Sequence, residues 1–222
     1  MSFQKFSIPL QTDSNTNMEL KERIINEING LLKIKSCRLL TMDEIANNLG
    51  ISKRTLYEQF KDKSSLLENC FNMNFEKAVI DSYKIVETSE NSLVSILLML
   101  KKANSSIHTI KYDYIKDLNK YYPEIYQKTF ERHINFQKEL RNKLLLNALE
   151  DNLVLDDINF DLLNSMIQLN LFYCSKNEYM IQNPNHSLIE IAMMHIFIIM
   201  RGVSTTKGIE IIDKYKDIFL KK

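Results

Sequence analysis

Glycine and proline are scarce in this sequence, whose 222 residues include only 4 glycines and 3 prolines. Turns depend heavily on these two residues, and a sheet protein of this size would need many of them. The scarcity therefore excludes a strand-rich fold and predicts few, long elements. Hydrophobic residues make up 45% of the chain, which suffices for a substantial core. The fold class that we expect is all-α.

Cysteines and long apolar runs are also few. The three cysteines, Cys37, Cys70 and Cys174, are odd in number and far apart, so the sequence predicts neither a disulfide framework nor a zinc site. The longest apolar run, 188–200, contains a glutamate and a histidine and is shorter than the about 20 residues that cross a bilayer. No N-terminal stretch has the apolar core of a signal peptide. We expect a cytoplasmic protein that makes no membrane contact.

Catalytic and metal-binding patterns are missing as well. The four histidines show no H-x-x-x-H or H-E-x-x-H spacing, and the chain has neither G-x-S-x-G nor a glycine-rich phosphate loop. These spacings are what helical zinc sites, nucleophile elbows and phosphate cradles require. We therefore expect no enzymatic activity, no metal and no cofactor.

The stretch 41–60, TMDEIANNLGISKRTLYEQF, has the pattern of two short helices joined by a tight turn. Thr41 can cap the first helix, and Glu44, three residues on, can reach back to the cap amide as in a capping box. Gly50 supplies the left-handed backbone conformation that ends a helix at low cost. Ser52 can cap the second helix. Two helices that cross at a glycine-containing turn form a helix-turn-helix.

The second of these helices has features of a DNA reader. Leu56 and Phe60 form its buried stripe, and the polar residues lie off that stripe. An α-helix fits the major groove, where its first turn reaches base edges. Basic residues outnumber acidic ones by two over 52–63, whereas the whole chain has a net charge of only +1. This local positive charge favours DNA binding; a structural corner in an all-α protein is the alternative.

A family resemblance rests on these same residues. The pattern T-x-x-x-I-A-x-x-x-G-I-S-K-x-T-L-Y-x-x-F-x-x-K-x-x-L, from Thr41 to Leu66, resembles the DNA-binding signature of TetR-type transcriptional regulators. The resemblance implies that the phosphate contacts come from Thr41, Thr55, Tyr57 and Lys63, and the base-edge contacts from Lys53, Arg54 and Glu58. Ser52 and Lys61 complete the expected DNA-binding set. The family often has a small residue at position 54, so the sequence leaves open whether Arg54 reads a base or a phosphate.

Domain organisation follows from helical periodicity and from the resemblance. We expect a mobile N-terminal arm over 1–16, a DNA-binding domain over 17–77 and an all-helical regulatory and dimerisation domain over 78–222. The periodicity predicts long helices outside the helix-turn-helix, at 18–36, 63–87, 92–109, 112–120, 124–150, 158–181, 188–203 and 205–220. The helix 63–87 would link the two domains as a lever.

A homodimer is expected from the helix 188–203, which is apolar nearly all round. Such a helix must be covered on all faces, and a partner subunit would supply the missing cover. In the TetR-type plan the last two long helices, here 158–181 and 188–203, pair with their copies. The expected interface residues are Met166, Leu169, Ile191, Met194, Ile198 and Ile199. Burial of this helix within one subunit is the alternative.

The regulatory half contains aromatic and methionine side chains that could line a cavity for a small apolar or amphipathic effector. The candidates are Tyr83, Met99, His108, Tyr112, Phe136, Met166 and Tyr173, although the same pattern also fits a plain helical core. We expect a repressor that this effector releases from a palindromic operator. The alternatives are a helix-turn-helix dimer without effector, acting as an activator or under a partner's control, and an all-α binding protein that does not bind DNA.

Overall fold

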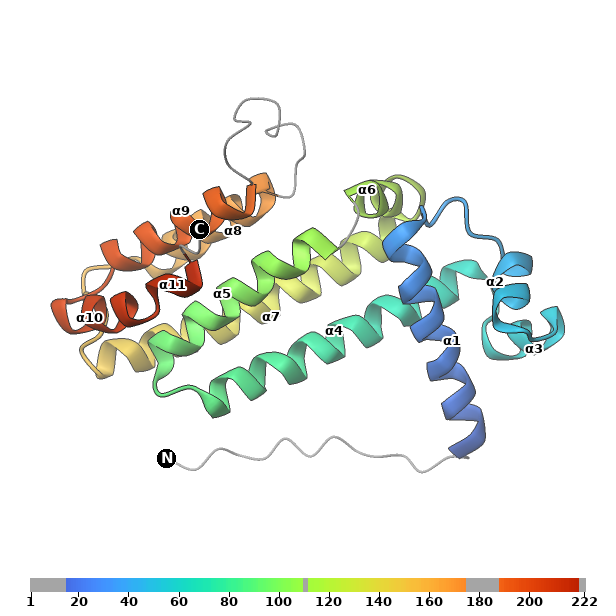
Figure 1. Cartoon of the computed structure of the whole chain (residues 1–222), viewed down its shortest axis with the longest axis horizontal. Helices are drawn as coiled ribbons and strands as arrows, with labels where there is room; N and C mark the ends of the chain where they lie inside the picture. Colours follow the sequence, from blue (N-terminus) through green and yellow to red (C-terminus); the bar gives the residue numbers. More distant parts are fainter. Residues whose placement is uncertain (1–14, 110–111, 175–187, 220–222) are drawn as a thin grey trace.

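The computed structural model of the chain describes the backbone of residues 15–109, 112–174 and 188–219, and the side chains of 19–103, 117–170 and 190–217. These residues form helices and no strand (Figure 1). The all-α prediction is confirmed. The helices are α1 (Asn15–Ile34), α2 (Met42–Leu49), α3 (Lys53–Gln59), α4 (Lys63–Thr88), α5 (Ser92–Thr109), α6 (Tyr112–Tyr121), α7 (Pro123–Glu150), α8 (Phe160–Cys174), α9 (Leu188–Gly202), α10 (Thr206–Lys214) and α11 (Lys216–Phe219).

The first predicted helix, expected over 18–36, is observed over Asn15–Ile34, and two others differ in ways that have a visible cause or consequence. The final helix, expected over 205–220, is divided into α10 and α11 at Tyr215. The helix expected over 158–181 starts at Phe160, because the Asn159 side chain accepts a hydrogen bond from the amide of Leu162 at 3.0 Å and so caps α8. Its expected C-terminal end lies outside the described residues, as does nearly all of the expected arm over 1–16.

The helices lie in two groups along the long axis of the molecule (Figure 1). The first group, which we call the head, contains α1, α2, α3 and the start of α4. The second contains α5, most of α7, and α8–α11. Helix α4 runs from the head along α5 and α7, and α6 lies against α7. The lever expected over 63–87 is thus a continuous helix of 26 residues.

Two hydrophobic clusters correspond to these groups. The head cluster takes buried residues from α1–α3 and from Leu66, Leu67 and Cys70 of α4. The regulatory cluster takes buried residues from α5 and α7–α10, with Ile85 and Val86 of α4 packed against it. The change from one cluster to the other lies inside α4, and the domain boundary expected between residues 77 and 78 stays a prediction. Leu118 of α6 is an exception, because it is buried in the head cluster.

Backbone hydrogen bonds join the segment between α9 and α10 to the loop that follows α7. Val154 and Ser204 form an isolated antiparallel bridge, and the amide of Thr205 donates to the carbonyl of Leu153 at 3.1 Å. Gly208 then lies so close that a Cβ atom there would clash with that carbonyl. In the part of the chain that the structure describes, no helix is long and apolar enough to cross a membrane.

Candidate DNA-binding site

Three helix caps set the geometry of the helix-turn-helix. The amide of Glu44 donates to the Thr41 hydroxyl at 3.2 Å, and the amide of Thr55 donates to the Ser52 hydroxyl at 3.0 Å. Gly50 ends α2 at φ 65°, in the left-handed region, as its position predicted. The Glu44 carboxylate accepts a hydrogen bond from the backbone of Thr41, as the expected capping box requires, and it also pairs with Lys35 near the end of α1. This pairing lowers the pKa of Glu44.

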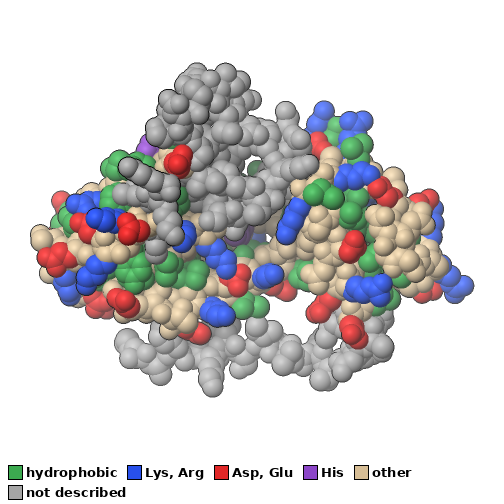
Figure 2. Space-filling model, viewed as in Figure 1, with side chains coloured by type: hydrophobic (Ala, Val, Ile, Leu, Met, Phe, Trp, Pro, Cys, Tyr) green, Lys and Arg blue, Asp and Glu red, His purple; other side chains and the backbone are tan. Residues whose placement is uncertain are grey.

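Helix α3 buries one side and exposes the other. Leu56 is completely buried, and Phe60, just past the helix, is buried beside it. Thr55 and Gln59 are half-buried, while the expected DNA-binding residues on and beside α3 are otherwise exposed, namely Ser52, Lys53, Arg54, Tyr57, Glu58 and Lys61. Figure 2 shows Lys and Arg side chains at the outer edge of the head, at the right of the view. The arrangement presents a short helix with donors and acceptors outward, which is what entry into a major groove requires.

Two exposed ion pairs engage the expected base-reading residues. The Lys53 ammonium lies 2.6 Å from the Asp43 carboxylate on α2, which raises the pKa of Lys53. The Arg54 guanidinium donates to Glu58, one turn further along α3, at 3.0 Å. The Arg54 side chain is still 89% exposed. It therefore remains accessible to a ligand that approaches α3.

Helix α1 braces the helix-turn-helix from behind. Ile24, Ile28 and Leu32 are buried in the head cluster. The Arg23 guanidinium donates to the carbonyl of Leu49 at 3.1 Å, at the end of α2 where carbonyls lack helical partners. These contacts hold α2 and α3 as one unit with α1.

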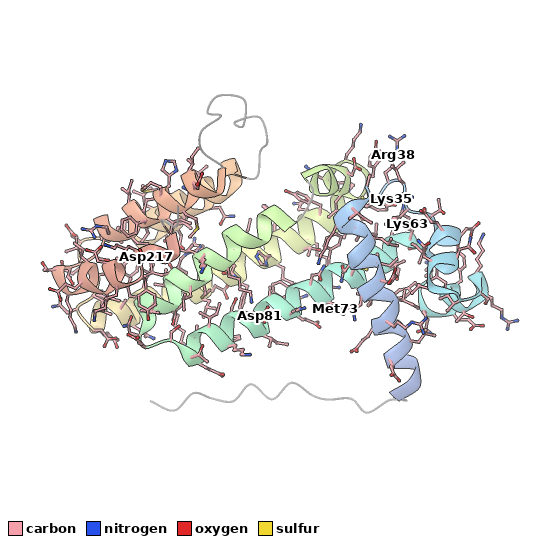
Figure 3. The ribbon with its side chains drawn as sticks, in the orientation of Figure 1. Lys35, Arg38, Lys63, Met73, Asp81 and Asp217 are labelled. Carbon is pink, nitrogen blue, oxygen red and sulfur yellow. The ribbon has the colours of Figure 1, made fainter. Side chains whose placement is uncertain are left out.

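The junction between the head and α6 contains further cations (Figure 3). The Arg38 guanidinium donates to the Tyr121 hydroxyl at 3.0 Å and lies over its ring at 5.1 Å. The Lys63 ammonium donates to the carbonyl of Arg38 at 3.2 Å and lies 5.9 Å from the centre of the Tyr122 ring. Burial lowers the pKa of Lys63. Lys63 is therefore held toward α6, and its expected phosphate contact remains a prediction.

Sequence reasoning missed the partners of these residues. Asp43, Lys35, Arg38 and Tyr121 each contact a residue near the expected DNA-binding surface. No local pattern indicates these contacts, because Lys35 lies just past the end of α1 and Tyr121 lies at the end of α6. The signal that could have found Lys35 and Arg38 is their positive charge a few residues before the helix-turn-helix.

The expected dimer residues lie on two neighbouring helices. Met166 and Leu169 on α8 are exposed, together with Leu162 one turn earlier. Met194 and Ile198 on α9 are also exposed, whereas Ile191 and Ile199 are half-buried. The opposite side of α9 is buried in one subunit through Ala192, Met193, Ile196 and Met200. One chain thus covers part of the apolar helix and leaves a row of its apolar side chains exposed.

The expected effector residues whose side chains are described do not all come together at one place. Tyr83 is half-exposed and contacts Phe136 edge-on at 6.0 Å between ring centres. Met99 is buried in the regulatory cluster, whereas Met166 is exposed on α8. The side chains of His108, Tyr112 and Tyr173 lie outside the described residues.

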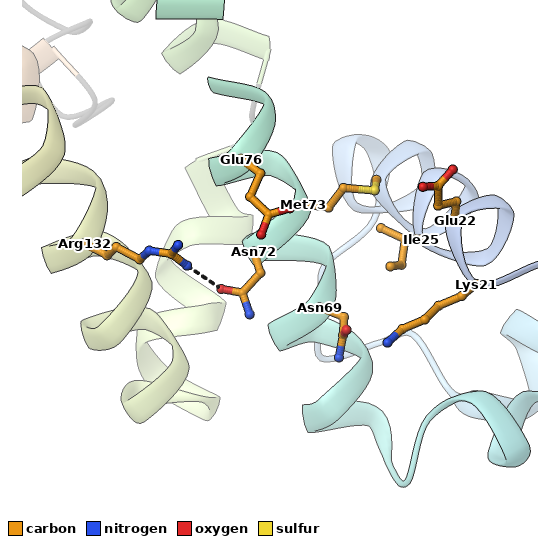
Figure 4. A pocket seen from close by; sticks show the side chains of 8 residues that line it. All are labelled: Lys21, Glu22, Ile25, Asn69, Asn72, Met73, Glu76 and Arg132. Atoms are coloured by element: carbon orange, nitrogen blue, oxygen red, sulfur yellow. Dashed lines mark hydrogen bonds between the residues drawn. The ribbon is translucent and has the colours of Figure 1, made fainter. Parts of the chain in front are cut away.

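A groove lies instead where the head meets α4 and α7 (Figure 4). Its volume is about 330 Å³. The Arg132 guanidinium reaches Asn72 at 3.4 Å and lies over the Phe75 ring at 4.2 Å. The lining is largely polar and comprises Lys21, Glu22, Ile25, Asn69, Asn72, Met73, Glu76 and Arg132. Within the described residues, no group of three or more His, Cys, Asp or Glu side chains could hold a metal ion.

Comparison with known proteins agrees with this geometry. Residues 31–70 match the family model for bacterial regulatory proteins of the tetR family. The matched stretch spans the end of α1, the helix-turn-helix and the first turns of α4. No curated protein sequence matches the chain.

Solved structures share the whole fold at low sequence identity. A TetR-family regulator from Marinobacter aquaeolei has a TM-score of 0.66 and 20% identity, covering 90% of this chain and 98% of its own. The regulator FadR from Bacillus subtilis, in complex with stearoyl-CoA, has a TM-score of 0.65 and 13% identity, covering 82% and 98%. The ketosteroid regulator KstR2 from Mycobacterium tuberculosis has a TM-score of 0.57 and 16% identity, covering 88% and 97%. Residues 31–70 thus match a tetR-family helix-turn-helix, and the whole chain shares the fold of solved TetR-family regulators.

Proposed function

We propose that this protein is a cytoplasmic homodimer that represses transcription by binding a palindromic operator, from which a small amphipathic effector releases it. The observation that carries the proposal is the capped helix-turn-helix, with α3 exposed on its polar side and the tetR family match over the same residues. Dimerisation, operator binding and release by an effector are further parts of the proposal, and each has its own argument.

The DNA contacts are proposed from the exposed positions around α3. Lys53, Arg54 and Glu58 face the base edges, since they lie in α3 itself and are exposed. The remaining expected residues surround them and would hold phosphates, namely Thr41, Ser52, Thr55, Tyr57, Lys61 and Lys63. Phosphate contacts fix the register of a protein on DNA, and base contacts supply the sequence preference.

The dimer is proposed from the exposed apolar rows of α8 and α9. Leu162, Met166 and Leu169 recur at helical spacing on α8, and Met194 and Ile198 do so on α9. Side chains of this kind in contiguous rows mark interaction surfaces. A second copy would cover them and place two α3 helices on one duplex. Successive major grooves lie about 34–36 Å apart, and this is the spacing that the two helices would need.

Effector control is proposed from the continuity of α4 and from the similarity of the fold to that of a regulator solved with a bound ligand. Helix α4 packs in both hydrophobic clusters, so a ligand that prefers one arrangement of the regulatory cluster can change the position of the head. The similar regulator FadR binds stearoyl-CoA in its solved structure. A helix-turn-helix dimer without effector is the second candidate, because the predicted effector residues with described side chains do not all gather in one place: Met166 is exposed on α8, whereas Met99 is buried.

Selection of bound sequences from random duplexes, repeated over a salt series, tests the proposal. We expect an inverted repeat with half-sites about one helical turn apart. We also expect log K to fall steeply with log salt, by about 0.9 per phosphate neutralised. Tyr57→Phe, which keeps the ring and removes one donor, serves as a folded control with weaker binding to all duplexes. Absence of any enriched sequence at every salt concentration would reject operator binding.

A further inference from the structure

We propose that Arg141 binds the carboxylate of an amphipathic effector between α7 and α8. This inference rests on the proposed function, whose effector it assigns to a chemical class. Arg141 is only 4% exposed and lies on the side of α7 that faces α8. Arg141 is not among the expected effector residues, because an arginine on a long amphipathic helix usually faces water.

The hydrogen bonds around Arg141 use little of its capacity. Its Nε donates to the Oδ1 of Asn164 on α8. Asn164 is itself buried and donates to the Asn142 side chain and to the carbonyl of Phe160, at 2.5 and 2.8 Å. A guanidinium carries five N–H donors. Within the described residues, the two terminal nitrogens of Arg141 donate no hydrogen bond, so most of this donor fork is unused.

No carboxylate balances the charge either. None of the ion pairs among the described residues includes Arg141. The acidic residue of α8, Asp161, pairs instead with Lys138 at the surface, at 2.9 Å. Asn164 and Asn142 are neutral amides. A buried cation without an anion is costly, and burial lowers the pKa of Arg141 to about 10. An anion that arrives from outside would remove this cost.

The chemistry of the neighbourhood defines that anion. The planar fork of a guanidinium matches a carboxylate, which it binds through two parallel hydrogen bonds. The buried residues next to Arg141 on α7 and α8 are apolar, namely Leu140, Leu144, Leu145, Leu163 and Ile167. A ligand that reached the guanidinium would therefore place its remaining atoms against hydrocarbon. This selects a monocarboxylate with an apolar body over a sugar, a nucleotide or an inorganic anion.

A purely structural role for Arg141, tying α7 to α8 through Asn164, makes the opposite prediction about stability. If Arg141 only serves the fold, Arg141→Met lowers the melting temperature of the ligand-free protein. If it awaits an anion, methionine fills a similar volume without a buried charge. The melting temperature then rises by about 2–4 °C.

The test is a thermal-shift titration of the full chain with octanoate, decanoate and dodecanoate, each below its micellar concentration, against the matching primary alcohols. We expect the carboxylates to raise the melting temperature of the unmodified protein more than the alcohols do. Arg141→Met should abolish this difference, with at least a tenfold loss of carboxylate affinity. Arg201→Met is the matched control, because Arg201 is half-exposed and paired with Asp213. It should keep the preference for carboxylates.

Equal stabilisation by acids and alcohols in the unmodified protein would overturn the proposal, and so would a carboxylate preference that survives Arg141→Met. DNA binding is measured separately on the selected duplex. There the carboxylate should weaken binding about tenfold in the unmodified protein and leave Arg141→Met bound. If no duplex is ever selected, the proposed function fails, while the titration still decides the role of Arg141.

Discussion

Two side chains that we propose to face DNA bases are already engaged on the protein surface. Lys53 pairs with Asp43, and Arg54 pairs with Glu58. Exposed ion pairs of this kind contribute only about 0–1 kcal/mol, whereas a good contact between arginine and guanine discriminates by about 1–3 kcal/mol. Exchange of the carboxylate for a base is therefore favourable. Before binding, the pair keeps the Arg54 guanidinium close to α3.

Arg54→Ala tests whether this residue reads a base. We expect a loss of about 1–3 kcal/mol for the selected duplex and a relaxed preference at one position of each half-site. The measurement is repeated sequence selection with the variant, together with binding isotherms on the selected duplex.

Lys61→Ala is the matched control, since it removes the same charge from an exposed position just past α3. It should weaken selected and random duplexes alike and reduce the salt slope by about one. If Arg54→Ala behaves in the same way as Lys61→Ala, Arg54 holds a phosphate.

At this scale the sequence predicts what is local and misses what is distant. The Thr41 and Ser52 caps and the left-handed Gly50 depend on residues within one turn, and all three are observed. The pairing of Glu44 with Lys35 and the contact of Arg38 with Tyr121 depend on how α1 and α6 pack against the head. Burial of Arg141 likewise depends on the position of α8, which periodicity along α7 does not fix.

Helix α9 shows how far an element can be predicted. Its apolar composition indicated cover on all sides, and Ala192 and Ile196 are indeed buried within one chain. Ile198, on another side, is 57% exposed. Periodicity could not divide the two sides, because apolar residues occupy both. The packing of α9 against α5, α8 and α10 decides which side remains for a partner.

Ile198→Glu tests the proposed dimer surface. A charge in the centre of an apolar interface leaves a buried, unpaired ion, so we expect monomers or insoluble protein and a loss of tight operator binding. Sedimentation velocity of the purified protein measures the change.

Ile80→Glu is the matched control, because Ile80 on α4 is similarly exposed, at 60%, and lies away from α8 and α9. It should leave the oligomeric state unchanged. A stable dimer in the Ile198→Glu variant would contradict the assignment of this surface.

The molecule as a whole has two hydrophobic clusters that share one helix, α4. If each cluster opens on its own, a cavity should loosen only the cluster that contains it. Leu118 and Leu100 are equally suited to this comparison, because both are buried leucines and they belong to the head and regulatory clusters respectively.

Leu118→Ala should speed amide hydrogen exchange in α1 and α2 and leave α9 protected, whereas Leu100→Ala should do the reverse. Each change should cost about 2–5 kcal/mol. Hydrogen exchange with mass spectrometry resolves the two regions. Equal acceleration in both regions for both variants would show a single cooperative unit and contradict a domain boundary within α4.

The burial of Leu118 in the head cluster, with Tyr122, Ile125 and Tyr126 packed against that cluster, limits how freely the head could be exchanged between regulators. The family match ends at residue 70, but a head cut out there would leave an apolar surface uncovered. A chimera that joins residues 1–77 to a foreign regulatory domain would need a matching α6 and a matching start of α7. The segment that is recognised by its sequence is therefore smaller than the part that an engineer could transplant.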